Sequence, residues 1–180
     1  MSSATLAPTL ETPRLSFTGH SLGDYEDCAS MWADPLVVRH VGGQPVSPQE
    51  VWTKLLRYVG HWQLLGYGYW VVRERDSGRF VGEVGFADFK RALVPSLDGT
   101  PEAGWVLASW AHGRGFATEA VSAALVWGDE RFARARTACI INVENLASIR
   151  VASKCGYREA VRTTYLGQPI ILSYRDPAIG

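Results

Sequence analysis

The sequence predicts a mixed α/β domain built around one central sheet. Residues 67–107 contain short segments rich in β-branched and aromatic residues, which favour strands. Two segments before them carry apolar residues at helical spacing, and a strand–helix–strand unit follows over residues 102–143. With 180 residues, of which 47% are hydrophobic, the chain is long enough to bury a core within one domain.

The first half is predicted to begin with a strand at residues 14–18, after a loose N-terminal arm at residues 1–12. Ser21 can cap a first helix, which Asp34-Pro35 ends because the residue before a proline avoids the helical region. The motif Ser47-Pro48-Gln49-Glu50 starts a second helix, since the serine and the glutamate can cap each other's backbone. This helix is predicted to run to Gly66.

A hairpin is predicted next, with strands at residues 67–74 and 79–89 joined by Asp76-Ser77-Gly78. A short strand at residues 102–107 follows the proline-containing loop 92–101. Together these segments predict that strands dominate the centre of the domain.

In the second half, a glycine-rich turn at residues 112–117 opens into a predicted helix at 118–132. Residues 136–143 form an apolar run typical of a buried strand. A short helix at 145–155 is ended by Lys154 and Gly156, and the chain closes with two strands, 157–165 and 169–175, joined by Gly167-Gln168.

Charge and composition exclude several classes of function. Lys+Arg and Asp+Glu both number 18, and this balance removes the main driving force for binding nucleic acid. The chain has no apolar run near the ~20 residues of a membrane helix, and its start lacks the pattern of a secretory signal. Cys28, Cys139 and Cys155 are odd in number and widely spaced, as in a reduced cytoplasmic protein without a metal site. A monomer or a homodimer is expected.

The turn at residues 112–117 is the segment that indicates chemistry. Gly113 and Gly115 leave no side chain in the way of a phosphate that approaches the helix N-terminus, where backbone N–H groups lack partners. A tight turn that needs glycine for backbone freedom would look the same. A Walker motif is absent, and the dinucleotide-binding motif lacks its third glycine, so a nucleotide-binding module is disfavoured.

Several motifs in the same order resemble the GNAT N-acetyltransferases, in particular the branch that acetylates ribosomal-protein N-termini (RimJ/RimL-like). The resemblance covers residues 10–175 and rests on an ordered set of short motifs. These are LETPRL at 10–15, VGEVGF at 81–86, EAGWVL at 102–107, GRGFATEA at 113–120, NLAS at 145–148 and KCGY at 154–157.

The resemblance implies one N-acetyltransferase domain over residues 13–176, with a twisted, mostly antiparallel sheet that splays near its middle and helices on both faces. It implies acetyl-CoA as donor and an amine as acceptor, which reacts by direct attack in a ternary complex. The acceptor is either a protein N-terminal α-amine or a small-molecule amine. The residues implied to bind acetyl-CoA are Val106, Leu107, His112, Gly113, Arg114, Gly115, Ala117, Thr118 and Asn145.

Two positions depart from the family pattern. His112 stands where the loop usually has Gln or Arg. Ala152 stands where much of the superfamily has a tyrosine that protonates the leaving thiolate, so Ser148 is the best local candidate for that acid. The missing tyrosine also leaves open a non-catalytic acyl-CoA-binding or regulatory protein of the same fold.

A neutral amine is needed for attack on a thioester. At pH 7 its deprotonation costs about 4–5 kcal/mol for a lysine side chain but about 1 kcal/mol for an α-amine. The candidate bases are carboxylates: Glu102 at the start of a strand, Glu83 within an apolar strand, and Asp88 as a weaker third. A strand N–H near Val106 or Leu107 is expected to polarise the thioester carbonyl.

Overall fold

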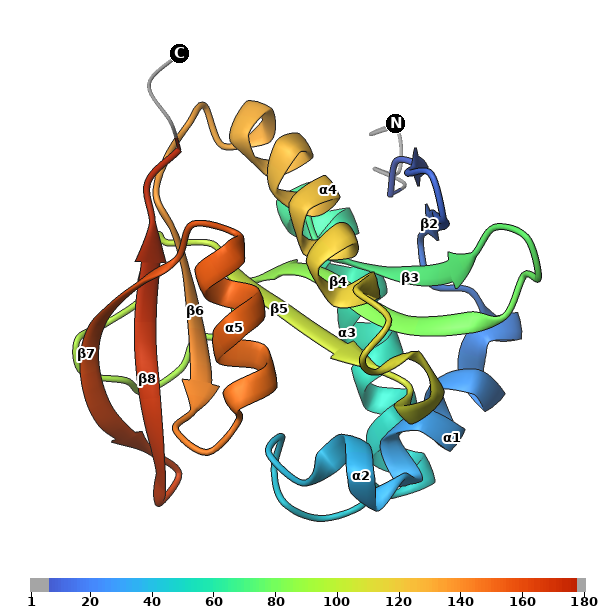
Figure 1. Ribbon diagram of the computed structural model, residues 1–180, viewed down its shortest axis with the longest axis horizontal. Helices are drawn as coiled ribbons and strands as arrows, with labels where there is room; N and C mark the ends of the chain where they lie inside the picture. Colours follow the sequence, from blue (N-terminus) through green and yellow to red (C-terminus); the bar gives the residue numbers. More distant parts are fainter. Residues whose placement is uncertain (1–6, 178–180) are drawn as a thin grey trace.

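An eight-stranded sheet organises the chain in the computed structural model, which describes residues 7–177. The strand order is β1-β2-β3-β4-β5-β6-β8-β7 (Figure 1). The strands are β1 (Leu10–Glu11), β2 (Leu15–Thr18), β3 (Tyr69–Glu74), β4 (Phe80–Ala87), β5 (Glu102–Leu107), β6 (Thr137–Asn142), β7 (Arg158–Tyr165) and β8 (Gln168–Arg175). All neighbouring strands are antiparallel except β5 and β6. The predicted fold class, a mixed and mostly antiparallel sheet, is confirmed.

Helices cover both faces of this sheet, as predicted. Helix α4 packs against β4 and β5, and α5 packs against β6, both on the near side in Figure 1. Helix α3 packs against β3 on the opposite face, where α1 also contacts β4. The helices are α1 (Tyr25–Ala33), α2 (Pro35–Val38), α3 (Pro48–Leu65), α4 (Phe116–Arg131) and α5 (Leu146–Lys154), with short 3₁₀ turns η1 (Leu22–Asp24) and η2 (Ser109–Ala111). None of the helices between residues 7 and 177 is both long and apolar enough to cross a bilayer.

The capping signals in the sequence act as expected. Ser47 Oγ accepts a hydrogen bond from the N–H of Glu50, and Glu50 Oε2 accepts one from the N–H of Ser47 at 2.9 Å. Helix α1 ends before Asp34-Pro35, but the chain turns directly into α2, because Asp34 Oδ1 accepts a hydrogen bond from the N–H of Leu36. The sequence therefore located the start of α3 and the end of α1. Ser21 precedes the short turn η1 and α1 begins only at Tyr25, and α2 was not predicted.

The expectation of a loose arm is wrong for residues 7–12. Leu10 and Glu11 pair with Phe17 and Ser16 as strand β1, and Trp70 Nε1 donates a hydrogen bond to the carbonyl oxygen of Pro8. The rest of the predicted arm, residues 1–6, lies outside the described residues. Two residues are too short for a pattern of alternation, so this strand had no sequence signal.

The core forms mainly between the sheet and α4. Phe17, Trp70, Phe86 and Phe116 are fully buried there. Trp62, Trp70 and Trp127 meet edge to face, with ring centroids 4.8–5.4 Å apart. These tryptophans pack the core.

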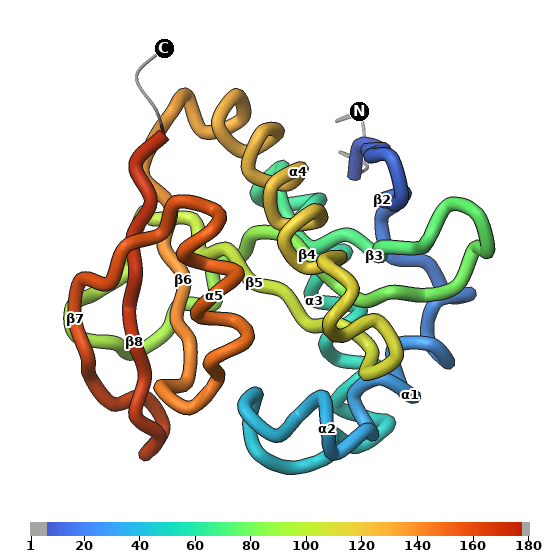
Figure 2. The backbone as a smooth tube through the Cα atoms, in the orientation of Figure 1, coloured from blue at the N-terminus to red at the C-terminus, as the bar shows by residue number. Residues whose placement is uncertain are grey.

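The sheet splays between β5 and β6. Their only paired position is Glu102 with Ala138, and from there the two strands diverge (Figures 1 and 2). The predicted splay near the middle of the sheet is confirmed, and it leaves one edge of β5 without a strand partner over most of its length.

Candidate active site

The glycine-containing loop after β5 leaves room for a phosphate at the N-terminus of α4. Gly113 and Gly115 have φ angles of +73° and +77°, and a Cβ on Gly113 would meet nothing within 4 Å. Helix α4 begins at Phe116, so the N–H groups of Ala117 and Thr118 lie in its first turn, where intrahelical acceptors are lacking. Both conditions for an anion site, open space and unpaired amides at a positive helix end, are met here.

Arginine side chains border this loop. Arg14 and Arg114 place their guanidinium carbons 4.6 and 4.7 Å from the ring centroid of Phe116, the first residue of α4. Arg79 lies 4.0 Å from the ring centroid of Trp110, beside a cavity of about 260 Å³. Arg14 pairs with Glu119 and Arg114 with Glu74, so part of the positive charge is compensated. The surroundings still favour an anion.

His112 turns back toward the sheet. Its Nε2 lies 2.9 Å from the carbonyl oxygen of Leu107, to which it donates a hydrogen bond. This contact fixes the loop on the end of β5. At the position where the resembling family has Gln or Arg, the side chain therefore bonds the protein's own backbone.

The open edge of β5 presents the backbone groups of Trp105 and Leu107. The N–H of Ala108 donates to Val81 on the β4 side, and the N–H of Ala138 in β6 donates to Pro101. Backbone groups of successive strand residues point to opposite sides, so those of Val106 face β4 and those of Trp105 and Leu107 face the gap. An extended ligand could pair with β5 through the latter two residues.

Asn145 and Ser148 lie together at the start of α5. Asn145 Oδ1 accepts a hydrogen bond from the N–H of Ser148 at 3.1 Å, so Asn145 caps the helix and its side-chain NH₂ remains available. Both residues are half-buried. Ala152, one turn further along α5, is buried in the core.

Glu83 is buried inside the protein, and both of its carboxylate oxygens accept hydrogen bonds. His20 Nε2 and Cys28 Sγ bond its Oε1 at 2.8 and 3.3 Å, and Trp32 Nε1 donates to its Oε2 at 2.8 Å. Burial by itself would raise the pKa of Glu83, but the hydrogen bonds and the charge of this environment lower it overall. Among buried side-chain nitrogen and oxygen atoms of residues 7–177, only His20 Nδ1 has no hydrogen-bond partner.

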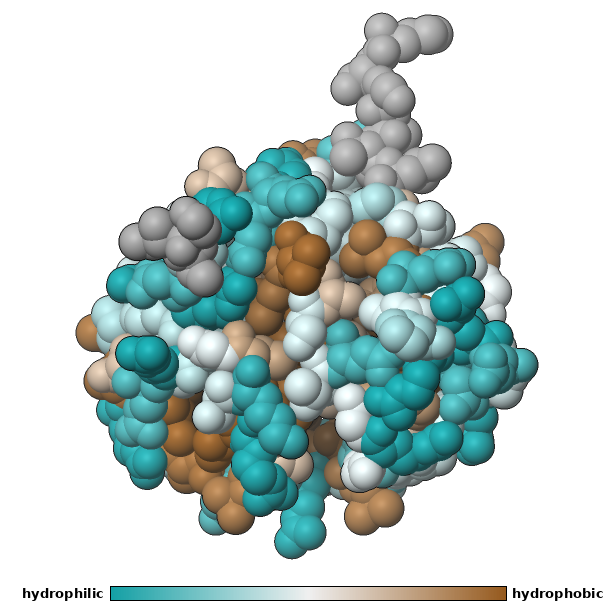
Figure 3. Space-filling model, turned by 45° about the horizontal axis from the view of Figure 1, so that its top comes forward, coloured by the Kyte–Doolittle hydropathy of each residue, from teal (hydrophilic) through white to brown (hydrophobic). Residues whose placement is uncertain are grey.

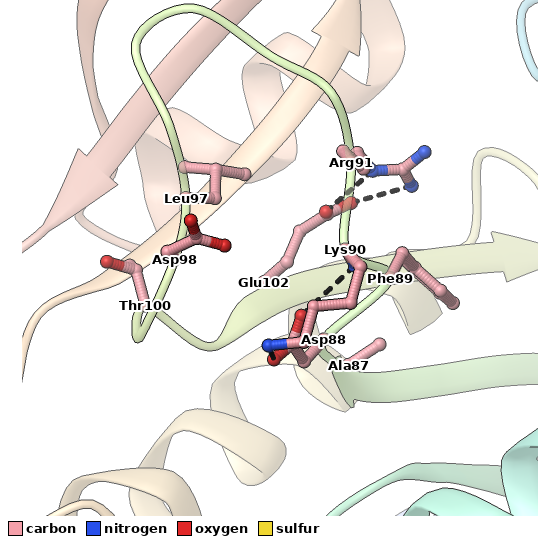
Figure 4. A pocket seen from close by; sticks show the side chains of 9 residues that line it. All are labelled: Ala87, Asp88, Phe89, Lys90, Arg91, Leu97, Asp98, Thr100 and Glu102. Carbon is pink, nitrogen blue, oxygen red and sulfur yellow. Dashed lines mark hydrogen bonds and ion pairs between the residues drawn. The ribbon is translucent and has the colours of Figure 1, made fainter.

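Glu102 is held by an arginine that the sequence analysis missed. Arg91 donates two hydrogen bonds, at 2.7 and 2.9 Å, to the two carboxylate oxygens (Figure 4). Arg91 also lies over the rings of Phe89 and Tyr165, which joins the β4–β5 loop to the β7–β8 hairpin. Asp88, the third candidate base, pairs with the exposed Lys90 at 2.7 Å. Arg91 lies in an irregular loop, where residues follow no periodic pattern, so its pairing with Glu102 could not be predicted from the sequence.

Comparison with known proteins identifies the family. The family model described as "Acetyltransferase (GNAT) domain" matches residues 14–158. The chain therefore belongs to the GNAT acetyltransferases. It is also 33% identical, over 104 residues, to "Uncharacterized protein YkkB" of Bacillus subtilis (strain 168). That match covers 54% of this chain and only 56% of the curated relative, about half its length.

Solved structures agree with this assignment. A GnaT-family acetyltransferase from Bordetella pertussis superposes with a TM-score of 0.83 at 29% identity, covering 94% of this chain and 99% of that one. The RimL ribosomal L7/L12 alpha-N-protein acetyltransferase, in complex with coenzyme A, has a TM-score of 0.76 at 13% identity, covering 94% and 98%. The second likeness is one of fold.

Proposed function

We propose that this chain transfers the acetyl group of acetyl-CoA to a primary amine by direct attack in a ternary complex. The observation that carries the proposal is the alignment of the loop with the open edge of β5. The loop lies just beyond Leu107, so a ligand whose phosphates bind there can extend along Trp105 toward Glu102, where the gap closes. The reactive end would then lie near Gly104 and Trp105.

The residues present fit such a ligand. The amides of residues 113–118 and the arginines beside them would hold the pyrophosphate. The NH₂ group of Asn145 would donate to the arm, and the N–H of Trp105 or Leu107 would polarise the acetyl carbonyl. Figure 3 shows hydrophobic residues between hydrophilic ones on the face of the molecule that it presents.

A peptide α-amine is the acceptor that this site favours. All three candidate bases have their carboxylate oxygens occupied. Three donors bond those of Glu83, and Arg91 bonds those of Glu102. The N–H and the side chain of Lys90 bond those of Asp88. Without a free base, the amine must lose its proton to solvent before it can react. At pH 7 this deprotonation costs about 1 kcal/mol for an α-amine but about 4–5 kcal/mol for a lysine side chain.

The test is thiol release from acetyl-CoA by the purified protein with a panel of amines: peptides with free N-termini, an Nα-blocked lysine peptide, spermidine and an aminoglycoside. We expect amine-dependent release, fastest for the free N-termini. Acetyl-CoA binding without release for any amine would instead support the non-catalytic, acyl-CoA-binding alternative.

A further inference from the structure

Tyr69 is in register with two glycines, one on each of the next two strands of the sheet. Tyr69 on β3 pairs with Gly85 on β4, which pairs with Gly104 on β5. Residues paired in this way present their side chains to the same face of the sheet. A Cβ on Gly104 would overlap the Tyr69 hydroxyl oxygen, and the phenol therefore reaches as far as β5.

The Tyr69 ring is held firmly while its hydroxyl stays available. The ring stacks on Tyr58 with centroids 4.6 Å apart and planes 10° apart, and the residue is 6% exposed. Within residues 7–177 the Tyr69 hydroxyl makes no hydrogen bond. In the same residues, His20 Nδ1 is the only polar side-chain atom that is both shielded from solvent and without a hydrogen-bond partner. The Tyr69 hydroxyl thus touches solvent and is free to donate.

The hydroxyl lies where the reactive end of the donor is expected. Gly104 is the neighbour of Trp105, whose backbone groups face the gap, and it stands close to Glu102, where β5 and β6 meet. A donor anchored beyond Leu107 reaches this point with its thioester. The tyrosine that the resembling family has on α5 is replaced by the buried Ala152, so the site lacks an acid from that helix.

We propose that the Tyr69 hydroxyl donates the proton that the departing CoA sulfur takes up; this rests on the proposed function. The amine nitrogen bonds to the acetyl carbonyl carbon as the carbon–sulfur bond breaks and its electron pair goes to sulfur. Sulfur takes the proton of Tyr69 Oη. The proton that the nitrogen loses returns to Oη through water, so the step is balanced and regenerates the hydroxyl.

The protonation state of Tyr69 agrees with this role. Burial raises the pKa of the phenol, and the negative charge of Glu102 raises it further. The hydroxyl is therefore protonated at neutral pH and holds a proton that it can donate. Its return to the protonated form after each turnover is correspondingly favourable.

Two variants and one control test the inference through turnover. Tyr69→Phe removes only the hydroxyl, and Gly104→Ala displaces it by filling the space that it occupies. We expect each to lower turnover by about 10²-fold or more, the size of a general-acid contribution. Acetyl-CoA affinity should change less than threefold, which corresponds to ~0.6 kcal/mol in the free energy of binding. Tyr58→Phe removes the hydroxyl of the stacked neighbour instead and should retain the wild-type turnover.

Calorimetric binding gives a second readout that does not need a working acceptor. If Tyr69 Oη contacts the sulfur, wild type should prefer CoA to desulfo-CoA, and Tyr69→Phe should reduce that preference by about 2- to 10-fold, the effect of one hydrogen bond. Tyr58→Phe should keep it.

The results that overturn the inference are distinct from those that overturn the proposed function. Turnover of Tyr69→Phe within threefold of wild type, or a loss of turnover in Ser148→Ala alone, assigns no acid role to Tyr69. An equal preference for CoA over desulfo-CoA in wild type and Tyr69→Phe does the same even if no amine is acetylated. Absence of transfer by wild type to every amine contradicts the proposed function only.

Discussion

His20 Nε2 and Glu83 Oε1 lie 2.8 Å apart, with 0% and 2% of their side chains exposed to solvent. The carboxylate is also bonded by Trp32 and Cys28 from α1. This cluster joins the end of β2, helix α1 and strand β4 on the α3 face of the sheet. A buried carboxylate in such a network contributes to stability only while it is charged.

Glu83 should make the stability of the protein depend on pH. Its pKa is lowered in the folded state, so its contribution is complete above the ordinary value of 4.5 and is lost as pH falls below it. Glu83→Gln should lower the free energy of unfolding by about 2–4 kcal/mol at pH 7 and by less at pH 4. Urea unfolding at both pH values measures this. Glu159→Gln, at an exposed surface pair, is the control, and a Glu83→Gln deficit that is the same at pH 7 and pH 4 would contradict the account.

The glycine loop can be tested with a matched pair of variants. Gly113 and Gly167 have φ angles of +73° and +76°, and a Cβ at either would meet nothing within 4 Å. Aspartate should therefore strain the backbone equally at both sites, by about 1 kcal/mol. Only Gly113→Asp also places a negative charge against the phosphate site, so it alone should lower acetyl-CoA affinity, by at least ~10-fold. Equal affinities of the two variants in calorimetry would remove the loop from the binding site.

Asn145 is expected to serve two purposes that one substitution can separate. Serine also caps helices, so Asn145→Ser should leave the free energy of unfolding within about 0.5 kcal/mol of wild type. It removes the side-chain NH₂, and acetyl-CoA affinity should fall by about 2- to 10-fold, the worth of one hydrogen bond. Unfolding and binding titrations on the same protein measure both. Unchanged affinity would leave Asn145 as a helix cap alone.

The ion pair of Glu102 with Arg91 is expected to be structural. Glu102→Gln leaves a partly buried arginine without its counter-charge, so the free energy of unfolding should fall by about 1–3 kcal/mol. Asp176→Asn breaks a pair of similar geometry with Arg136 at an exposed site and should have little effect. Because an α-amine loses its proton to solvent without a protein base, the plot of turnover against pH should have the same shape in Glu102→Gln as in wild type. A loss confined to low pH, rescued by raising the pH, would instead identify Glu102 as the base.

Local signals in the sequence predicted most of the fold. The capping motif at Ser47, the stop at Asp34-Pro35 and the strand at residues 102–107 depend on near neighbours, and all three are found in the structure. The last hairpin is displaced by one residue: Leu166 and Gly167 take the positive φ angles and Gln168 already belongs to β8. Leucine is rare in that conformation, so the turn was placed on the next pair.

The partners of the site residues could not be predicted in this way. Glu83 meets His20 from 63 positions earlier in the chain, and Glu102 meets Arg91 from an irregular loop. Tyr69 reaches β5 only because Gly85 and Gly104 stand in register with it. Such contacts depend on strand register, which the spacing of residues along one sequence does not determine.

The central claim is transfer of an acetyl group to an α-amine, and a competition within one molecule tests it most directly. A peptide with a free N-terminus and one internal lysine is incubated with the protein and acetyl-CoA at pH 7, and fragmentation mass spectrometry locates the product. The account predicts one acetyl group, on the α-nitrogen, because neutralising the lysine costs about 3–4 kcal/mol more. Acetylation mainly of the lysine, or no acetylation while acetyl-CoA is bound, would contradict it.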